Sequence, residues 1–317
     1  MSVYFGVDIG GTTIKLGLFG NGENLLDKWE IPTRKEQGGR YIIPDTAEEI
    51  KNMLERKNIS QKDILGIGLG IPGPVLLDGY VPACVNLNWK QVNPERELAG
   101  LLKDIPVYSG NDANVAALGE QWKGSGMGYD NLVMVTLGTG VGGAVILNGR
   151  IVSGAKGMAG EFGHISVNPD EKEICNCGNK GCLDQVASAT GIVRYAGYFL
   201  QKSKEESCLR GKESFTAKDV AEGAKAKDKV ALEALSYCMG HLGKCLAWVS
   251  HVIDPEVFII GGGVSGSGSF LIELIEESYR KHVFLNTQPV PIKQAALGGE
   301  AGIYGAARIA FLKSLDQ

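Results

Sequence analysis

Two short glycine-rich turns, each between two apolar segments, constrain the fold of this chain more than any other feature. The turn at residues 10–13 reads Gly-Gly-Thr-Thr, and the turn at residues 138–143 reads Gly-Thr-Gly-Val-Gly-Gly. The flanking strands are expected at residues 3–8, 14–19, 131–137 and 144–147. An Asn-Gly turn signal closes each unit, at residues 21–22 and 148–149. This repeated plan of strand, glycine hairpin and strand predicts two related α/β halves with a cleft between them.

Glycine is also the outlier in composition. The chain has 45 glycines in 317 residues, about twice the usual share of about 7%. The glycines do not recur at every third residue, which argues against collagen. The chain has only 11 prolines, which argues against a disordered Pro/Gly tract. Glycine at the junctions of elements supplies tight turns or lets the backbone approach a ligand closely. The clusters therefore indicate an enzyme that holds phosphates on its main chain.

Charge, hydropathy and cysteine content narrow the class of protein. The net charge of −4, without a basic stripe, argues against nucleic acid as the main partner. The sequence contains no run of 18 apolar residues, so no membrane span is expected. Asp8 interrupts the N-terminal apolar run, which argues against a signal peptide. Seven cysteines without a secretory signal argue against a disulfide framework. We therefore expect a cytoplasmic protein of about two domains.

Outside the hairpins, apolar periodicity and turn residues predict a mixed α/β chain. Further strands are expected at residues 25–31, 64–70, 107–109 and 257–260. Helices are expected near residues 46–56, 114–122, 231–252, 270–281 and 300–312.

Two segments match the dinucleotide pattern G-x-G-x-x-G, from Gly68 to Gly73 and from Gly138 to Gly143. That fingerprint requires its last glycine to open a helix whose N-terminus holds the pyrophosphate. The first match continues into Pro72 and Pro74, and the second continues into a strand-like segment. The context therefore argues against a Rossmann oxidoreductase.

The turn after Asp8 fits a different phosphate chemistry. Its backbone N–H groups carry little Cβ obstruction and can cradle phosphate oxygens. Asp8 at the strand end is suited to Mg²⁺ held through water, and Lys15 adds positive charge. The candidates of this hairpin are Asp8, Gly10, Gly11, Thr12, Thr13 and Lys15. The alternative is a tight hairpin with an incidental aspartate, but the second glycine hairpin favours nucleotide binding.

Three cysteines lie within eight residues, at Cys175, Cys177 and Cys182, and His164 lies eleven residues upstream of the first. Three thiolates and one imidazole make a closed tetrahedral site of the structural zinc type. The alternative is a loop with free thiols. Their clustering, with Gly178 and Gly181 between them, favours zinc.

Together, these residues carry a family resemblance. The segments that carry it are Asp8-x-Gly10-Gly11-Thr12-x-x-Lys15, Leu137-Gly138-Thr139-Gly140-x-Gly142-Gly143, Asn111-Asp112-Ala113-Asn114, Glu161-x-Gly163-His164 and Cys175-x-Cys177-Gly178-x-x-Gly181-Cys182. The first two resemble the phosphate loops of the actin-like ATPase fold. The whole ordered set resembles the ROK family of sugar kinases and repressors, most closely its bacterial glucokinases, from residue 3 to about residue 310.

The resemblance implies an actin-like, ribonuclease H-like duplicated α/β fold, with ATP and sugar in the cleft between two lobes. We expect a small lobe at residues 1–113, with a C-terminal helix at 300–317 packing back on it, and a large lobe at 114–299 that carries the zinc loop. The first phosphate-loop strand at Val3 leaves no room for the helix-turn-helix segment of the family's repressors. The resemblance also implies a homodimer or homotetramer.

It further assigns roles to residues. Asp112 would be the base that accepts the hydroxyl proton, and Asn111, Glu161 and His164 would bind the sugar. The alternatives are that Asn111 and Asp112 only cap the following helix, and that Glu161 and His164 are an ordinary surface acid and a core histidine. The second set of nucleotide contacts would be Gly138, Thr139, Gly140, Gly142, Gly261, Gly262 and Gly263. Zinc would order the loop and place His164 against the sugar.

One position departs from the family. The usual cysteine motif ends in C-x-E, and that glutamate contacts the sugar, whereas this chain has Asp184. Aspartate is one methylene shorter, so water would have to bridge to the same hydroxyl.

The sequence therefore predicts an ATP- and Mg²⁺-dependent hexose kinase with structural zinc, making glucose 6-phosphate from D-glucose. The rivals are a ROK kinase for N-acetylmannosamine, fructose or allose, and a non-catalytic sugar-binding regulator.

Overall fold

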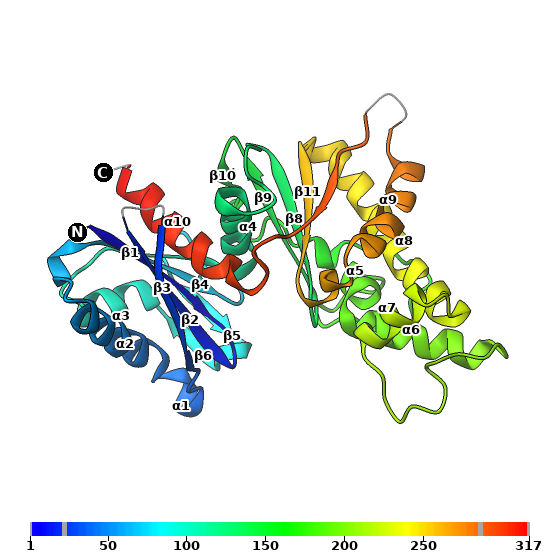
Figure 1. The fold of residues 1–317 in the computed structure, drawn as a ribbon, viewed down its shortest axis with the longest axis horizontal. Coiled ribbons are helices and arrows are strands. Elements are labelled where there is room, and N and C mark those ends of the chain that lie inside the picture. Colours follow the sequence, from blue (N-terminus) through cyan, green and yellow to red (C-terminus); the bar gives the residue numbers. More distant parts are fainter. Residues whose placement is uncertain (1, 21–23, 285–287, 316–317) are drawn as a thin grey trace. The chain divides into compact units, whose positions relative to one another are not determined.

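The computed structural model describes residues 2–20, 24–284 and 288–315. The expected turn at Asn21 and Gly22 lies outside these residues. The chain forms two compact units (Figure 1), and the chain passes from one to the other more than once. The first unit contains residues 1–128, 151–159 and 297–317, and the second contains residues 129–150 and 160–296.

The sheet of the first unit has five strands in the order β3-β2-β1-β4-β7. Its strands are β1 (Val3–Ile9), β2 (Thr13–Gly20), β3 (Asn24–Pro32), β4 (Ile64–Ile71) and β7 (Val107–Asn111). β1, β2 and β3 form an antiparallel meander, whereas β4 pairs parallel to both β1 and β7. The carboxyl ends of β1, β4 and β7 therefore meet at one edge of the sheet.

Helices cover both faces of this sheet. The helices of the unit are α1 (Glu36–Gly39), α2 (Ile42–Lys57), α3 (Pro94–Leu101), α4 (Asp112–Lys123) and α10 (Ala301–Leu315). Phe5 and Val7 of β1 share a buried core with Ile50 of α2 and Leu98 of α3. A short hairpin, β5 (Val81–Cys84) and β6 (Trp89–Val92), adds Val81 and Trp89 to that core. The opposite face is covered by α10, shown in red in Figure 1.

Glycines let α10 approach the sheet and α4 at backbone distance. A Cβ at Gly6 of β1 would lie 2.0 Å from the carbonyl oxygen of Ile303, and one at Gly68 of β4 would lie 1.8 Å from that of Ala306. Gly6 and Gly68 are direct partners across the parallel ladder. On the helix side, a Cβ at Gly305 would lie 1.6 Å from the Val115 carbonyl oxygen of α4. Only hydrogen fits at these three positions.

The second unit repeats the plan in its sheet, whose order is β10-β9-β8-β11-β12. The strands are β8 (Leu132–Leu137), β9 (Val141–Leu147), β10 (Arg150–Ile151), β11 (Val257–Gly261) and β12 (Ile292–Gln294). β8 pairs antiparallel with β9 and parallel with β11, as β1 does with β2 and β4. The duplication expected from the two hairpins is confirmed.

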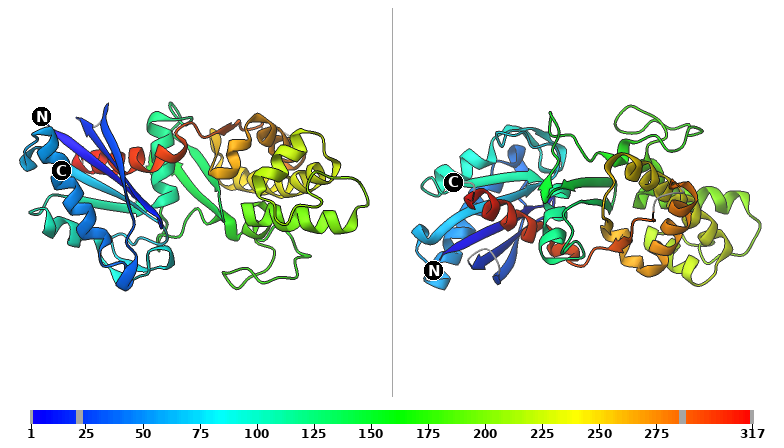
Figure 2. Two further views of the ribbon diagram at one scale, coloured as in Figure 1. Left: turned by 60° about the horizontal axis from the view of Figure 1, so that its bottom comes forward. Right: turned by 90° about the horizontal axis from the view of Figure 1, so that it is seen from above.

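The second unit is richer in helix. Its helices are α5 (Leu183–Ala187), α6 (Ala189–Lys202), α7 (Ala217–Lys225), α8 (Lys229–Ile253) and α9 (Ser269–His282). The views in Figure 2 show α8 and α9 side by side, and Gly243 of α8 lies against the backbone of Ile275 in α9. None of the helices in the described ranges is long and apolar enough to cross a membrane.

The expected strands and helices are confirmed with shifts at their ends. The helix expected from residue 46 begins at Ile42, and the one expected at residues 114–122 covers Asp112–Lys123. Sequence periodicity missed α3, α6, α7 and the β5–β6 hairpin.

The packing of α10 predicts a large cost for a methyl group at Gly68. We expect Gly68→Ala to lower the free energy of unfolding by about 2–3 kcal/mol or more, because its Cβ would overlap the α10 backbone. Gly100→Ala in α3 is the matched control, since a Cβ there meets nothing within 4 Å. That control should gain about 0.5–1 kcal/mol from helix propensity. Urea unfolding of both variants measures the difference, and equal effects would contradict the packing argument.

Candidate active site

Three candidate residues of the first unit lie at the edge where β1, β4 and β7 end. Asp8 is the penultimate residue of β1 and is paired with Gly70 of β4, while Asn111 ends β7 and is paired with Ile71 of β4. Asp112 is the first residue of α4. Because parallel strands end at the same edge, residues separated by a hundred positions in sequence form one polar cluster.

Asp8 is the electrostatically unusual member of this cluster. Burial of its carboxyl group, followed by the nearby negative charge of Asp112, raises the pKa of Asp8 to about 6, while Lys15 opposes the shift. Lys15 faces Asp8 across the β1–β2 ladder. A Cβ at Gly302 of α10 would lie 2.4 Å from the Asp8 carboxylate, so the glycine makes room for it. Two interacting carboxyl groups with different environments are typical of a site that binds a cation or moves a proton.

The turn between β1 and β2 is held from both sides. The backbone N–H of Gly10 donates to the Thr13 carbonyl at 3.0 Å. Thr33 binds the same turn twice, with its hydroxyl donating to the Gly10 carbonyl at 2.7 Å and its N–H donating to the Thr12 carbonyl at 2.9 Å. Within the described residues, the N–H groups of Gly11 and Thr12 at the tip have no protein acceptor. They are the donors that an anion could use.

Asn111 and Asp112 have different surroundings. The Asn111 side-chain oxygen accepts from the N–H groups of Ala113 at 3.0 Å and Asn114 at 3.3 Å, so Asn111 caps α4. Its Nδ2 donates to the Gly73 carbonyl at 3.1 Å. Asp112 is exposed, and its Oδ1 accepts from the Ala113 N–H at 2.8 Å. The cap is therefore real, and it fixes the position of Asp112 at the helix N-terminus.

The start of α10 also belongs to this edge, which sequence reasoning missed. Lys15 Nζ donates to the Gly299 carbonyl at 2.8 Å. The buried Glu120 of α4 accepts from the Leu297 N–H at 2.7 Å and so holds the segment that leads into α10. The only sequence signals were the paired glycines at 298–299 and Gly302, whose partners lie far away in the chain.

The candidates of the second unit include two glycine-rich turns at one edge of its sheet. Gly138, Thr139 and Gly140 form the β8–β9 turn, whereas Gly142 lies in β9 opposite Thr136. Gly261 ends β11 and is also paired with Thr136, in β8. A Cβ at Gly262, which has a φ of +82°, would lie 2.4 Å from the Leu137 carbonyl oxygen. The glycine run after β11 is thus packed tightly against the β8–β9 turn.

Glu161 precedes a one-turn helix, η3 (Phe162–His164), and His164 ends it; both side chains are exposed. A Cβ at Gly163 would lie 2.2 Å from the Val141 carbonyl oxygen, so η3 packs directly on the start of β9. Glu161 and His164 therefore sit close to the second glycine hairpin, on a turn whose Gly163 and Phe162 pack against β9. The alternative of a buried core histidine is not what the structure has, since His164 is exposed.

His164 gathers with the three predicted cysteines. Ligand atoms of His164, Cys175, Cys177 and Cys182 all lie within 4.8 Å of one another. The Sγ atoms of Cys177 and Cys182 are 3.5 Å apart, and Cys175 Sγ is 3.9 Å from His164 Nδ1. Tetrahedral zinc with Zn–S distances of about 2.3 Å needs sulfur atoms about 3.8 Å apart. The donor set and its spacing fit zinc.

The thiols of Cys177 and Cys182 have different surroundings. Burial raises the pKa of Cys182 to about 12, whereas the backbone N–H of Asn179 lowers the pKa of Cys177. A bound cation is needed to hold the Cys182 thiol as thiolate at neutral pH. Glycines close the loop, since Gly178 and Gly181 have φ of +90° and +75°.

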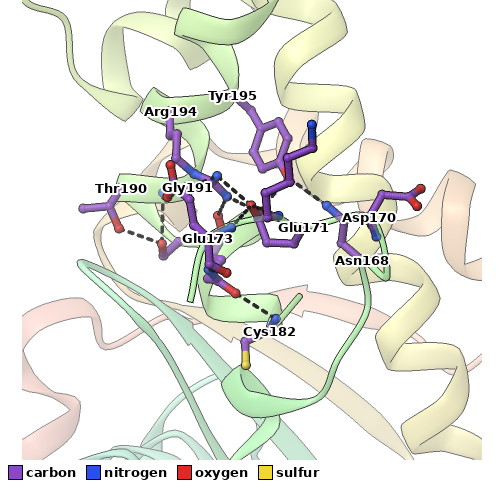
Figure 3. A network of polar contacts seen from close by, with 12 residues as sticks. Asn168, Asp170, Glu171, Glu173, Cys182, Thr190, Gly191, Arg194 and Tyr195 are labelled. Atoms are coloured by element: carbon purple, nitrogen blue, oxygen red, sulfur yellow. Dashed lines mark hydrogen bonds and ion pairs between the residues drawn. The ribbon is translucent and has the colours of Figure 1, made fainter. Parts of the chain in front are cut away.

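A polar network anchors the segment between His164 and the cysteines (Figure 3). Arg194 of α6 forms an ion pair with Glu171, whose pKa it holds near 2, and also donates to the Gln185 carbonyl at 3.0 Å. Tyr195 donates to Glu171 at 3.1 Å, and Asn168 donates to the Tyr195 hydroxyl at 2.8 Å. Sequence reasoning missed these residues, because an Arg–Glu pair 23 positions apart carries no local signal.

Asp184 lies in α5, directly after the last cysteine. Its Oδ1 accepts from the Val141 N–H of the β8–β9 hairpin at 2.6 Å. The predicted contact of Asp184 with the sugar stays a prediction. What the structure adds is that this carboxylate is hydrogen-bonded to the β8–β9 hairpin.

Comparisons with known proteins agree with this architecture. The model of the ROK family matches residues 4–312. A glucokinase from Halalkalibacterium halodurans is 41% identical over 95% of this chain and 93% of its own length. A ROK hexokinase structure from Thermus thermophilus superposes with a TM-score of 0.85 at 31% identity, covering 99% of this chain and 100% of that one. The structure of a ROK family glucokinase from Streptomyces griseus in complex with glucose and AMPPNP gives a TM-score of 0.78 at 32% identity, covering 97% and 99%. The resemblance found in the motifs is thus confirmed along nearly the whole chain, and the protein belongs to the ROK family.

Proposed function

We propose that this chain is an ATP-dependent hexose kinase that converts D-glucose to glucose 6-phosphate. The observation that carries the proposal is the cluster of Asp8, Asn111 and Asp112 at the carboxyl edge of three parallel strands. Beside it lies a glycine turn whose tip N–H groups have no acceptor in the described part of the chain. The glucokinase relatives, which match this chain over nearly their full length, are the basis for proposing glucose as the sugar and ATP as the phosphate donor.

In this reaction the 6-hydroxyl oxygen of glucose attacks the γ-phosphorus of ATP. The new O–P bond forms as the bond between the γ-phosphorus and the β–γ bridging oxygen breaks, and ADP leaves. Asp112 accepts the hydroxyl proton from its exposed place at the N-terminus of α4. Asn111, Glu161 and His164 hydrogen-bond the sugar hydroxyls, and Asp184 is the further candidate on the sugar side.

The two glycine hairpins bind the nucleotide, with the Gly261–Gly263 run along the adenosine. Asp8 would hold Mg²⁺ through water, and the cation would neutralise phosphate charge. The raised pKa of Asp8 fits this role, because a buried carboxyl group next to a second one gains most from a cation. Lys15, bonded to Gly299, contributes positive charge beside the same turn.

Zinc would be held by His164, Cys175, Cys177 and Cys182, and its contribution is structural. His164 Nδ1 faces Cys175 Sγ at 3.9 Å, so this nitrogen is the ligand atom. The other ring nitrogen, Nε2, lies on the opposite edge of the imidazole and is available for the sugar. One histidine can therefore serve both predicted roles.

Asp184 is the observation that favours a second candidate, a ROK kinase for a different hexose such as N-acetylmannosamine, fructose or allose. A shortened acid at a sugar-contacting position changes which hydroxyl it can reach. A coupled ADP-release assay across a panel of hexoses distinguishes the candidates by kcat/KM. A non-catalytic regulator would release no ADP with any of them.

The proposed setting is the cytoplasm, where ATP and reduced thiols are both available. The homodimer or homotetramer implied by the resemblance stays a prediction, for which sedimentation velocity of the purified chain is the measurement.

Replacing the proposed base should abolish most turnover. We expect Asp112→Asn to lower kcat by at least about 10²-fold, since the amide cannot accept the proton. Asp104→Asn is the matched control, because Asp104 is exposed and its φ of 60° is tolerated by asparagine. The ADP-release assay measures both variants. Equal kcat for Asp112→Asn and wild type would remove Asp112 from the mechanism.

The raised pKa of Asp8 makes a prediction about stability and pH. The folded protein binds this proton up to about pH 6 whereas the unfolded chain releases it near 3.8. Stability is therefore lost as pH rises through this window, by about 3 kcal/mol at pH 7.5. Asp8→Asn should consequently gain stability relative to wild type between pH 4 and 7.5. Urea unfolding with EDTA and without nucleotide measures the difference, which must grow with pH if the carboxyl group is responsible.

Zinc removal should weaken sugar binding. We expect about one zinc per chain by metal analysis, and Cys177→Ser should lose the metal and raise KM for the sugar. Cys208→Ser is the control, since Cys208 is an exposed thiol outside the cluster. Freshly purified wild-type protein without zinc, never exposed to chelator, would contradict the assignment.

A further inference from the structure

The contact between Asp184 and the second glycine hairpin connects two parts of the site that the proposed function treats separately. Asp184 follows Cys182 by two residues, and Cys182 is the N-cap of α5. The Asp184 carboxylate nevertheless accepts a hydrogen bond from the β8–β9 hairpin. The donor is the Val141 N–H at 2.6 Å, the length of a charge-assisted hydrogen bond. Asp184 is partly buried.

Two neighbours of Asp184 bind the same hairpin. The N–H of Ala189, the first residue of α6, donates to the Gly138 carbonyl at 2.8 Å. The Thr190 hydroxyl donates to the Thr139 carbonyl at 2.9 Å. The segment from α5 to the start of α6 therefore binds three of the four residues from Gly138 to Val141.

The hairpin itself is shaped for this contact. A Cβ at Gly140 would lie 2.7 Å from Asp184 Oδ1, so the glycine leaves the space that the carboxylate fills. The Gly138 N–H is used inside the turn, donating to the Gly140 carbonyl at 2.9 Å. Since Asp184 takes the Val141 N–H, the N–H groups of Thr139 and Gly140 are those without a protein acceptor among the described residues of the turn. Asp184 thus determines which donors the hairpin presents.

We propose that Asp184 is a positioning residue for the nucleotide: it fixes the β8–β9 hairpin so that the N–H groups of Thr139 and Gly140 are directed to the phosphates. The inference rests on the proposed function for the identity of the ligand, but it assigns Asp184 to the phosphate side of the site as well as to the sugar side. A ligand of diphosphate or triphosphate chemistry should therefore detect the loss of this carboxylate even when no sugar is present.

The test is isothermal titration calorimetry with ADP and Mg²⁺ in the absence of sugar. We expect Asp184→Ala to weaken ADP binding by at least about tenfold, the effect of losing one hydrogen bond to a charged group. Asp184→Asn should weaken binding less, because the amide oxygen can still accept from the Val141 N–H. In steady-state assays the same order should appear in KM for ATP. An ADP affinity within twofold of wild type in Asp184→Ala would overturn the proposal, whatever happens to KM for the sugar.

A second variant keeps the test valid if Asp184→Ala is unstable. Thr190→Val removes the bonds of this hydroxyl to the Thr139 carbonyl and to the Ser188 hydroxyl while leaving Asp184 in place, and Thr190→Ser restores a hydroxyl. We expect weaker ADP binding in the valine variant and recovery in the serine variant, with thermal unfolding checked on the same samples. Unchanged affinity in a folded Thr190→Val protein would contradict the idea that this segment sets the hairpin.

Failure of this inference can be told apart from failure of the proposed function. Wild-type protein that binds ADP but phosphorylates none of the hexoses would contradict the kinase assignment alone. Wild-type protein that binds no ADP would overturn both, because the hairpin would then hold no phosphate.

Discussion

The close approach of α10 to the first sheet is the contact on which the arrangement of the first unit depends. Gly6 and Gly68, neighbours across β1 and β4, leave no side chain between the sheet and the helix backbone. Gly305 does the same between α10 and α4. The helix therefore lies low enough for its first turn to meet the polar edge, where Gly302 accommodates the Asp8 carboxylate. The high glycine content first suggests turns that bind a ligand. Several of these glycines instead permit close packing of α10, which positions Asp8 at the end of β1.

Sequence reasoning succeeded where the signal is local. The two hairpins, their flanking strands and the long α8 have strong periodicity or turn residues within a few positions, and each is found where it was expected. It failed for α6 and α7, although both helices are amphipathic, and for the β5–β6 hairpin, whose two strands have only four residues each. The close packing of α10 was also beyond reach, because Gly68 and Ala306 are partners only after the chain has folded.

In the candidate site, too, the features with a local sequence signal were predicted and those without one were missed. The cysteine cluster is recognisable because its ligands and glycines are close in sequence, and the structure brings the ligand atoms within 4.8 Å of one another. The polar edge of Asp8, Asn111 and Asp112 was reached through motifs and is explained by parallel strands ending together. The residues that support these groups, such as Arg194 with Glu171 and Glu120 with Leu297, were not predicted. Supporting contacts join distant segments through single hydrogen bonds, and a single sequence holds no pattern that reports them.

The order of the chain through the first unit bears on how the protein is made. The five strands of the main sheet and the helices α1 to α4 lie before residue 129, yet the helix that covers one face of that sheet begins at Ala301. During synthesis on the ribosome, the face of the sheet that contains Gly6, Gly17 and Gly68 therefore stays uncovered while the entire second unit is translated. Glycine exposes less apolar area than valine or leucine would at the same positions. The uncovered face therefore offers other chains less apolar area to bind. Glycine therefore lowers the apolar area of the uncovered face but does not remove it, since Tyr4 and Phe19 also pack on α10 there.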